Sequence, residues 1–460
     1  MLTEVKRDNF KSFWDKYSDT PDNTAMMLNN NAGTLEEDDR RDILSSLPDV
    51  TNKDAVDIGA GIGRFTTVLA QTARWVLTTD FIDSFIKKNK ERNAQFDNVH
   101  YQVGDAVHLR MEDSSVDLVF TNWLMMYLSD REVIEFLMSA MRWSRPNGCV
   151  HLRESCTEPS TGRTTGNTLH NHAEANPTHY RDASLYIKLL KEFRYRDAEG
   201  KLWRFDVLWS CSVPTYIKRM QNWRQVHWLA KKVPAEEGEE KSFDDYLELF
   251  SITWQDIQNS WNEELEPEQH VWTDQIFDTV LGTDAVPEGS TAYVYTPRVI
   301  SPYCHVDSHR IAQKLSSNVW NVELDPYYYT TSLTRANTVK DKRVRYGWNE
   351  NLQASVDYWK QRGGDFNALV ATELLATNDA QSIRDLVSIL NPSAKAFLLE
   401  PVESIDKDEL SKKLTESGFK TFEITDITDD ALHAQRAYFE AHKKPAEVVG
   451  KHWVLIEATL

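Results

Sequence analysis

The sequence has few cysteines, no long apolar run and no concentrated positive charge, and each absence excludes a class of protein. Four cysteines among 460 residues, none in a Cys-x-x-Cys pair, exclude a disulfide scaffold and indicate reduced thiols in a cytoplasmic protein. No apolar stretch is long enough to cross a bilayer and the first residues lack the apolar core of a signal peptide, so we expect no membrane insertion. A formal net charge of −19, with only short basic runs, disfavours a nucleic-acid partner.

Glycine is concentrated in one part of the chain and missing from another. Three glycines fall within "VDIGAGIGRF", Val56–Phe65, whereas no glycine occurs between Gly289 and Gly347. A chain of 460 residues with 41% hydrophobic residues can build two cores. We therefore expect two domains, with a tight glycine turn for a ligand in the first and none in the second.

The first half of the chain alternates strand-like and helix-like segments. From Asp54 to Glu154, short apolar runs are followed by stretches with helical periodicity. This alternation predicts an α/β fold with a parallel, doubly wound sheet and helices on both faces. Ligands of such sheets bind at the carboxyl ends of the strands, where the glycine turn is expected to lie.

A second segment repeats this pattern. Val116–Ser155 and Phe366–Val402 each read as an apolar strand, a short loop, an amphipathic helix, a proline-containing turn and a second strand. The second strand contains an acid in both segments, Glu154 in one and Glu400 in the other. We interpret this similarity as an internal repeat.

The domains are expected to meet at an acidic segment, Lys231–Ser242, which contains proline and glycine and few apolar residues. The prediction is a catalytic domain over residues 1–232. Residues 233–460 are predicted to form a degenerate copy of it that lacks the glycine loop.

The glycine turn has the spacing Gly59-x-Gly61-x-Gly63, which differs from the Gly-x-Gly-x-x-Gly of dinucleotide-binding folds. Its backbone N–H groups and the helix that follows can bind a phosphate or a carboxylate. Asp80, at the end of the next predicted strand, can accept hydrogen bonds from ribose hydroxyls, as in sites for NAD and for S-adenosylmethionine. These features alone leave both cofactors open.

Further features along the same sheet edge resemble the class I S-adenosylmethionine-dependent methyltransferases. "GDA", Gly104–Ala106, follows the third predicted strand, and "TNW", Thr121–Trp123, follows the fourth. In that family the residue corresponding to Asp105 contacts the adenine amino group. The resemblance implies S-adenosylmethionine as cofactor, with S-adenosylhomocysteine as its product. The implied cofactor-binding residues are Asp57, Gly59, Ala60, Gly61, Gly63, Asp80, Phe81, Asp105, Ala106 and Asn122.

Longer motifs over roughly Phe13 to Trp228 resemble the phosphoethanolamine N-methyltransferases: "GAGIGRFT", "DFIDSFIKKN", "NWLMMYLSD", "LRESC" and "NPTHYRDASLYIKLLKEF". The resemblance implies N-methylation of phosphoethanolamine to phosphomonomethylethanolamine, the first step toward phosphocholine. Nematode-type members that keep only the N-terminal site perform this one step. The resemblance therefore also implies a functional partnership with a second methyltransferase that completes phosphocholine.

A phosphate-bearing substrate calls for arginine, lysine and tyrosine donors. "THYRDASLY" supplies Tyr180, Arg181 and Tyr186, and the resemblance places Lys218 at a phosphate-contacting position. Tyr186, at helical spacing, is equally compatible with a core residue. Lys218 is equally compatible with a solvated surface lysine.

Methyl transfer to an amine needs an unprotonated nitrogen aimed at the methyl carbon and no metal, so positioning should supply most of the acceleration. The single-domain members of the family pair a tyrosine of an N-terminal lid with a histidine after the fourth strand. Here Tyr17 is the expected lid residue, and Tyr127 stands in place of the histidine. A phenol with an ordinary pKa of about 10 would need tuning to act as a base, or else it orients the amine.

A cluster of histidines, His170, His172 and His179, raises the question of a zinc site. No cysteine or carboxylate stands at the spacing of a structural zinc site, so we expect no metal and assign these histidines to a substrate loop or lid.

Three alternative functions stay open at this stage. An NAD-dependent oxidoreductase would also use a glycine loop and Asp80, although the glycine spacing disfavours it. A non-catalytic S-adenosylmethionine-binding regulator would bind the cofactor without turnover. A methyltransferase for another small acceptor, such as a sterol or quinone precursor, is the third alternative. Tyr180 and Arg181 favour an anionic acceptor.

Overall fold

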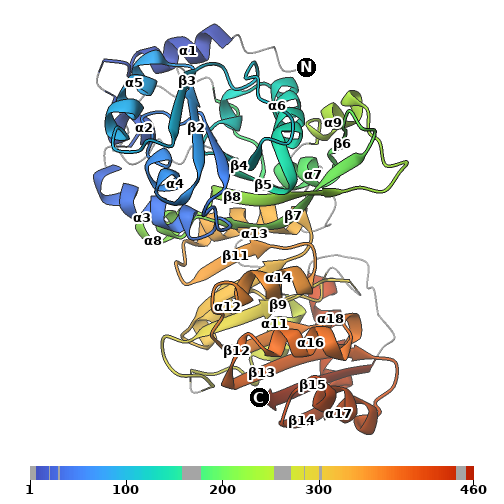
Figure 1. Ribbon diagram of the computed structural model, residues 1–460. Coiled ribbons are helices and arrows are strands. Elements are labelled where there is room, and N and C mark those ends of the chain that lie inside the picture. The colour runs from blue at the N-terminus through green and yellow to red at the C-terminus, as the bar shows by residue number, and fades with distance from the viewer. Residues whose placement is uncertain are drawn as a thin grey trace. The chain divides into compact units, whose positions relative to one another are not determined.

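The computed structural model describes residues 7–19, 21–29, 32–157, 178–252, 271–283, 285–299, 303–441 and 452–460. The chain divides into two compact units, Met1–Asp256 and Ile257–Leu460 (Figure 1). Each unit is a sheet covered by helices, as predicted from the alternation of strand-like and helix-like segments.

The sheet of the first unit has the strand order β3-β2-β1-β4-β5-β8-β7, and the short β6 pairs with β7. Strands β3, β2, β1, β4 and β5 are parallel, whereas β8 is antiparallel to both of its neighbours. The strands are β1 (Asp54–Ile58), β2 (Trp75–Asp80), β3 (Val99–Val103), β4 (Val116–Thr121), β5 (Ser144–Ser155), β6 (Arg194–Arg196), β7 (Leu202–Ser212) and β8 (Gln225–Pro234).

Helices of this unit cover the sheet, and the first three of them form the amino-terminal segment that precedes β1. The helices are α1 (Arg7–Asp15), α2 (Asn23–Met27), α3 (Ala32–Leu44), α4 (Thr66–Thr72), α5 (Asp83–Arg92), the 3-10 turn η1 (Met125–Tyr127), α6 (Asp130–Trp143), α7 (Ala183–Glu192), α8 (Pro214–Met220) and α9 (Phe243–Leu249). Because helices cover both faces, every residue of β1 is buried. Helix α6 begins at a capping box formed by Ser129 and Glu132, which satisfies N–H groups at its first turn.

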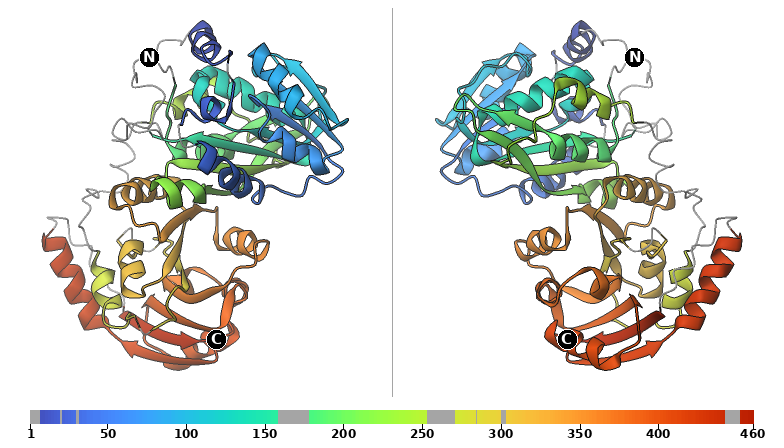
Figure 2. Two further views of the ribbon diagram at one scale, coloured as in Figure 1. Left: turned by 90° about the vertical axis from the view of Figure 1, so that its left-hand side faces the viewer. Right: turned by 90° about the vertical axis from the view of Figure 1, so that its right-hand side faces the viewer.

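The second unit repeats the topology of the first, with the strand order β11-β10-β9-β12-β13-β15-β14. Its strands are β9 (Thr291–Tyr295), β10 (Asn318–Glu323), β11 (Val344–Trp348), β12 (Phe366–Thr372), β13 (Leu390–Val402), β14 (Thr421–Asp426) and β15 (His452–Thr459). Its helices include α11 (Trp272–Phe277), α12 (Ser308–Lys314), α13 (Pro326–Val339), α14 (Leu352–Lys360), α15 (Leu374–Thr377), α16 (Ala380–Val387), α17 (Lys407–Glu416) and α18 (Thr428–Ala441). Both views of Figure 2 show α18 beside α11 at one side of this sheet.

Strand register shows which residues of the two units are equivalent. Ile58 of β1 pairs with Thr79 of β2, and Tyr295 of β9 pairs with Val322 of β10. The next residue is Asp80 in the first unit and Glu323 in the second. The two acids therefore occupy the same position at the carboxyl end of the second strand, which confirms the predicted internal repeat.

The boundary between the units lies later in the chain than the predicted one after residue 232. That position falls inside β8, where Lys232 and Val233 pair with β7. Ser242, expected in a linker, caps α9, which packs against α6 and α7. The acidic composition of this segment reflects a strand end and an exposed helix start, and the compact units divide between Asp256 and Ile257.

No helix among the described residues is both long and apolar enough to span a lipid bilayer.

Candidate active site

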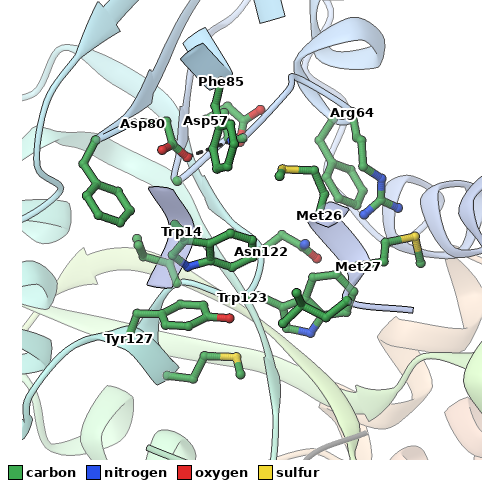
Figure 3. Close-up of a pocket in the computed structure, with 18 of the residues that line it drawn as sticks. Trp14, Met26, Met27, Asp57, Arg64, Asp80, Phe85, Asn122, Trp123 and Tyr127 are labelled. Carbon is green, nitrogen blue, oxygen red and sulfur yellow. Dashed lines mark hydrogen bonds between the residues drawn. The ribbon is translucent and has the colours of Figure 1, made fainter. Parts of the chain in front are cut away.

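Two adjoining cavities, of about 130 and about 340 Å³, lie at the carboxyl ends of the parallel strands of the first unit. Both are lined by Gly59, Asp80, Phe81, Leu124 and Tyr127, so they form one cleft. Figure 3 shows residues that line the first of these cavities, with Asp57 and Asp80 on one side and Trp123 and Tyr127 on the other. This is the sheet edge at which the sequence predicts a ligand.

The glycine turn connects β1 to the helix that follows and forms part of the cleft wall. All three glycines have positive φ, +71° at Gly59, +53° at Gly61 and +77° at Gly63, where side chains are strained. A Cβ at Gly63 would lie 2.2 Å from Asn89 Oδ1, so this glycine permits close packing against α5. Gly59, Ala60 and Gly61 line the cleft, whereas Gly63 does not.

Two buried aspartates stand beside the turn. Asp80 Oδ2 accepts a hydrogen bond from Gly61 N at 2.9 Å, and its Oδ1 accepts one from Ile82 N at 3.0 Å. Asp57 Oδ2 accepts from Thr66 Oγ1 at 2.6 Å. Burial raises the pKa of Asp80 to about 6 and that of Asp57 to about 7, and the nearby Asp80 carboxylate contributes to the increase at Asp57.

The second cavity extends along the ends of β2 and β3 and contains the residues predicted for the adenine end. Asp105 and Ala106 line it together with Phe81. Asp105 Oδ1 accepts a hydrogen bond from Val107 N at 3.0 Å, which fixes the carboxylate after β3. Asn122, after β4, lines the first cavity.

An aromatic group closes the cleft near the amino-terminal helix. Trp14, near the end of α1, lines the cleft and contacts Tyr127 and Phe85 edge-on, with its ring centroid 5.5 and 6.0 Å from theirs. Burial raises the pKa of Tyr127 well above its ordinary value, with further contributions from Tyr180 and Glu154. Tyr127 is therefore a neutral phenol at neutral pH and is not present as a phenolate that could act as a base.

Tyr17, the other predicted catalytic residue, lies just after α1 and is 9% exposed. Its ring packs against Phe13 and Trp14, with centroids 5.7 and 5.6 Å away, and it does not line the cleft. A part in catalysis for Tyr17 stays a prediction.

Only one of the four residues predicted to contact phosphate lines the cleft. Tyr180 does so, at the end where Tyr127 and Ser155 lie. Lys218 is exposed on α8 and lies outside the cleft lining. A phosphate contact by Lys218 would need a different arrangement from the one described.

Arg181 and Tyr186 are buried beneath the turn after β4. Arg181 donates to Met125 O at 2.8 Å, to Leu128 O at 2.7 Å and to Asp130 Oδ1. Tyr186 is 1% exposed, packs on Trp228 and hydrogen-bonds Arg181. Neither lines the cleft, so a phosphate contact by Arg181 would require these bonds to be exchanged, and Tyr186 takes the core position that its helical spacing also allowed.

Several lining residues escaped the sequence reasoning. Most are apolar, and only Trp14, Met26, Met27 and Leu28 lie outside the quoted motifs. The others stand inside those motifs, so their position beside the predicted site residues was the signal available. The full set is Trp14, Met26, Met27, Leu28, Arg64, Phe65, Phe85, Trp123, Leu124, Met126 and Ser155.

Within the described part of the chain, no three or more His, Cys, Asp or Glu side chains are arranged to hold a metal ion. His170 and His172 lie outside the described residues. His179 is described, and its backbone N–H donates to Met126 O at 2.7 Å.

Comparisons with known proteins agree with this geometry. Residues 55–148 match the sequence model of a family described as methyltransferase domain. The chain is 57% identical over its full length to phosphoethanolamine N-methyltransferase 1 of Caenorhabditis elegans, of which it covers 97%. It is 60% identical to phosphoethanolamine N-methyltransferase 1 of Haemonchus contortus, solved with phosphoethanolamine and S-adenosylhomocysteine, with a TM-score of 0.96 and coverage of 100% and 99% of the two chains.

A more distant solved structure shares the fold alone. Haemonchus contortus phosphoethanolamine N-methyltransferase 2 is 14% identical, with a TM-score of 0.59 over 92% of this chain and 99% of the other.

The sheet topology, the glycine turn and the acid at the end of β2 define the fold of an S-adenosylmethionine-dependent methyltransferase. The sequence identity to relatives over the whole chain assigns it to one family within that class. The chain belongs to the phosphoethanolamine N-methyltransferases.

Proposed function

We propose that this chain transfers a methyl group from S-adenosylmethionine to the amine of phosphoethanolamine, giving phosphomonomethylethanolamine and S-adenosylhomocysteine. The observation that supports it most strongly is the cleft in the first unit, found in a chain 60% identical to an enzyme solved with phosphoethanolamine and S-adenosylhomocysteine. Gly59, Gly61 and Asp80 line the first cavity and Asp105 lines the second, which supports a cofactor bound along this edge of the sheet.

The described residues fit that cofactor. Asp80 presents a buried carboxylate for ribose hydroxyls, and its bond to Gly61 holds the turn open beside it. Asp105 lies in the second cavity, where an adenine amino group can donate to it. When bound, the cofactor supplies a methyl group on a sulfonium, an electrophile that needs no metal. Cβ atoms at Gly59 and Gly61 would approach Leu124 and Met26, which line the same cavity, so glycine keeps that space open.

The acceptor amine must reach the methyl group with its lone pair free. Tyr127 and Trp14 line the same cavity as the glycine turn, so they can orient a small amine there. Because the pKa of Tyr127 is raised well above its ordinary value, its neutral hydroxyl orients the amine as a hydrogen-bond partner, and water accepts the proton. Tyr180, in the same lining, can donate to the substrate phosphate.

The second unit keeps the fold and, we infer, has lost the cofactor site. Arg298, after β9, forms an ion pair with Glu323 at 3.7 Å and stacks 4.0 Å from the centre of the Tyr328 ring. Glu323 is the residue equivalent to Asp80. Val299 N donates to Glu373 Oε2 at 2.8 Å, so protein groups occupy the region where the first unit has its cleft.

A full route to phosphocholine requires two further methylations. We propose that a second methyltransferase performs them, and that this chain releases the monomethyl product instead of methylating it again.

The test is methyl transfer from labelled S-adenosylmethionine to phosphoethanolamine, phosphomonomethylethanolamine and free ethanolamine in parallel. Transfer to phosphoethanolamine alone is expected. Binding of S-adenosylhomocysteine without transfer to any acceptor would favour a non-catalytic regulator. Transfer to free ethanolamine at the same rate would refute recognition of the phosphate and favour another small acceptor.

A further inference from the structure

Arg153, on β5, lies directly behind two residues of the cleft wall. Its side chain is fully buried, and its guanidinium carbon stands 3.7 Å from the centre of the Trp123 ring. Its Nη1 donates to Asn122 Oδ1 at 3.2 Å. Asn122 and Trp123 both line the cleft, and Figure 3 shows Trp123 on the side away from Asp57 and Asp80. One guanidinium therefore contacts two consecutive wall residues.

The other end of this guanidinium is tied to the amino-terminal helix α3. Arg153 Nη2 lies 3.3 Å from Asp39 Oδ1, and Asp39 is itself fully buried. Asp39 Oδ2 pairs with Arg64 Nη2 at 2.9 Å. Arg64 follows the glycine turn and lines the cleft. The shared carboxylate thus connects the wall after β4 to the glycine turn.

Trp123 is fixed from a second direction as well. Its indole Nε1 donates to Gln225 Oε1 at 2.9 Å, and Gln225 Nε2 donates to Ser155 Oγ at 2.8 Å. With the arginine against its face and the glutamine at its edge, the indole has one orientation.

The second unit shows what the fold itself requires at this place. Trp123 and Glu373 are equivalent: both have positive φ, +58° and +55°. The N–H of Trp123 donates to Arg153 O at 2.7 Å, and that of Glu373 donates to Leu399 O at 3.0 Å. Leu399 is thus the counterpart of Arg153. The same backbone turn forms with a buried leucine in place of a buried arginine, so the fold does not require the charge.

A buried arginine is also costly where an apolar residue would serve. Ion pairs inside proteins recover their desolvation cost only with complete hydrogen bonding, and apolar replacements are often as stable. Among the described residues Arg153 Nε has no hydrogen-bond partner. The fold forms with leucine at the equivalent place, so what distinguishes the first unit is the set of contacts that Arg153 makes with Asn122, Trp123, Asp39 and Tyr216.

We propose that Arg153 is a positioning residue for methyl transfer, holding the Trp123 indole and the Asn122 amide as the wall against which the acceptor amine is aligned. The inference rests on the proposed function. The planar guanidinium stacks on Trp123 and donates to Asn122 at the same time, which a lysine ammonium cannot do.

The test is Arg153→Leu, the residue found at the equivalent place in the second unit, in the full-length protein. Asp39 keeps its pair with Arg64 in this variant, so no carboxylate is left unpaired. The expected result is a fall in kcat for phosphoethanolamine on the order of 10²-fold, with affinity for S-adenosylhomocysteine and Tm retained. Arg153→Lys, which keeps the charge, should recover little of the loss.

Arg145→Leu is the matched control. Arg145 pairs with Asp54 and Asp117 at the opposite end of the strands, so its loss should leave kcat unchanged. Wild-type kcat in Arg153→Leu, full recovery in Arg153→Lys, or parallel losses of kcat, S-adenosylhomocysteine affinity and Tm in Arg153→Leu would each overturn the inference. Absence of transfer by the wild-type protein would instead refute the proposed function.

Discussion

Asp80 Oδ2 accepts a hydrogen bond from the Gly61 N–H at 2.9 Å, so the end of β2 fixes the glycine turn that follows β1. The same carboxylate thus holds the loop in place and lines the cleft, where it can accept further hydrogen bonds. Its burial explains its raised pKa, and its place in the cleft lining leaves it within reach of ribose hydroxyls.

Cofactor affinity should depend on the protonation of Asp80. Hydroxyls donate to the ionised carboxylate, so binding favours the charged form, whose population rises with pH through the pKa of about 6. Affinity for S-adenosylhomocysteine should therefore rise about tenfold from pH 5 to pH 7 and level off above it. Titration calorimetry at constant ionic strength measures this. Asp80→Asn should bind more weakly, with the step near pH 6 removed.

Asp57→Asn is the control for that experiment, since it removes the neighbouring carboxyl and keeps Asp80. The step near pH 6 should persist. An unchanged step in Asp80→Asn would show that another group controls binding.

Gly63→Ala should lower stability more than Gly200→Ala. Both glycines have positive φ, +77° and +85°, so both alanines carry the same backbone strain, about 1 kcal/mol. A Cβ at Gly63 also collides with Asn89, whereas none of the atoms near Gly200 lies within 4 Å of such a Cβ. The collision should add about 1–3 kcal/mol. Thermal unfolding and S-adenosylhomocysteine binding measure the effects, and equal Tm values for the two variants would contradict the packing argument.

Glu154 and Glu400 should contribute similarly to stability and differently to activity. Glu154 accepts from Leu124 N and Met125 N at 3.0 and 2.8 Å, holding the turn that leads to Tyr127. Glu400 accepts from Ala376 N at 3.2 Å in the equivalent turn. Replacing either with Gln places an amide N–H against backbone donors, a cost of about 1–3 kcal/mol.

Only Glu154→Gln should also lower kcat, measured well below the melting temperature. Equal kcat losses in Glu154→Gln and Glu400→Gln would mean that the second unit takes part in the chemistry.

The chain should bind one molecule of S-adenosylhomocysteine. The first unit has the cleft, and in the second unit Arg298 pairs with the acid equivalent to Asp80. Titration calorimetry with the full-length protein should give a stoichiometry of one. A second equivalent would place a cofactor in the second unit.

The fold and the residues that follow the parallel strands at the cleft could be predicted because their signals are local. A strand, a glycine turn and an acid at the next strand's end are adjacent features of sequence, and the topology brings their ends together. Asp80, Asp105 and Asn122 therefore line the cleft as expected.

The positions of the residues predicted to contact phosphate were harder to predict, because contacts between distant segments decide where these side chains lie. Arg181 looks like a phosphate ligand in the sequence, yet carbonyls of Met125 and Leu128 take its donors. Nothing in the sequence indicates a role for Arg153, which stands in a strand of buried residues. Its partners Asp39 and Trp123 come from separate segments. Such pairs depend on tertiary packing, which periodicity and spacing do not encode.

The most direct test of the central claim is mass analysis of the product after prolonged incubation of the full-length protein with phosphoethanolamine and excess S-adenosylmethionine. The expected end product is phosphomonomethylethanolamine, which carries one added methyl group. Unmodified phosphoethanolamine, or accumulation of the dimethyl or trimethyl product, would contradict this claim.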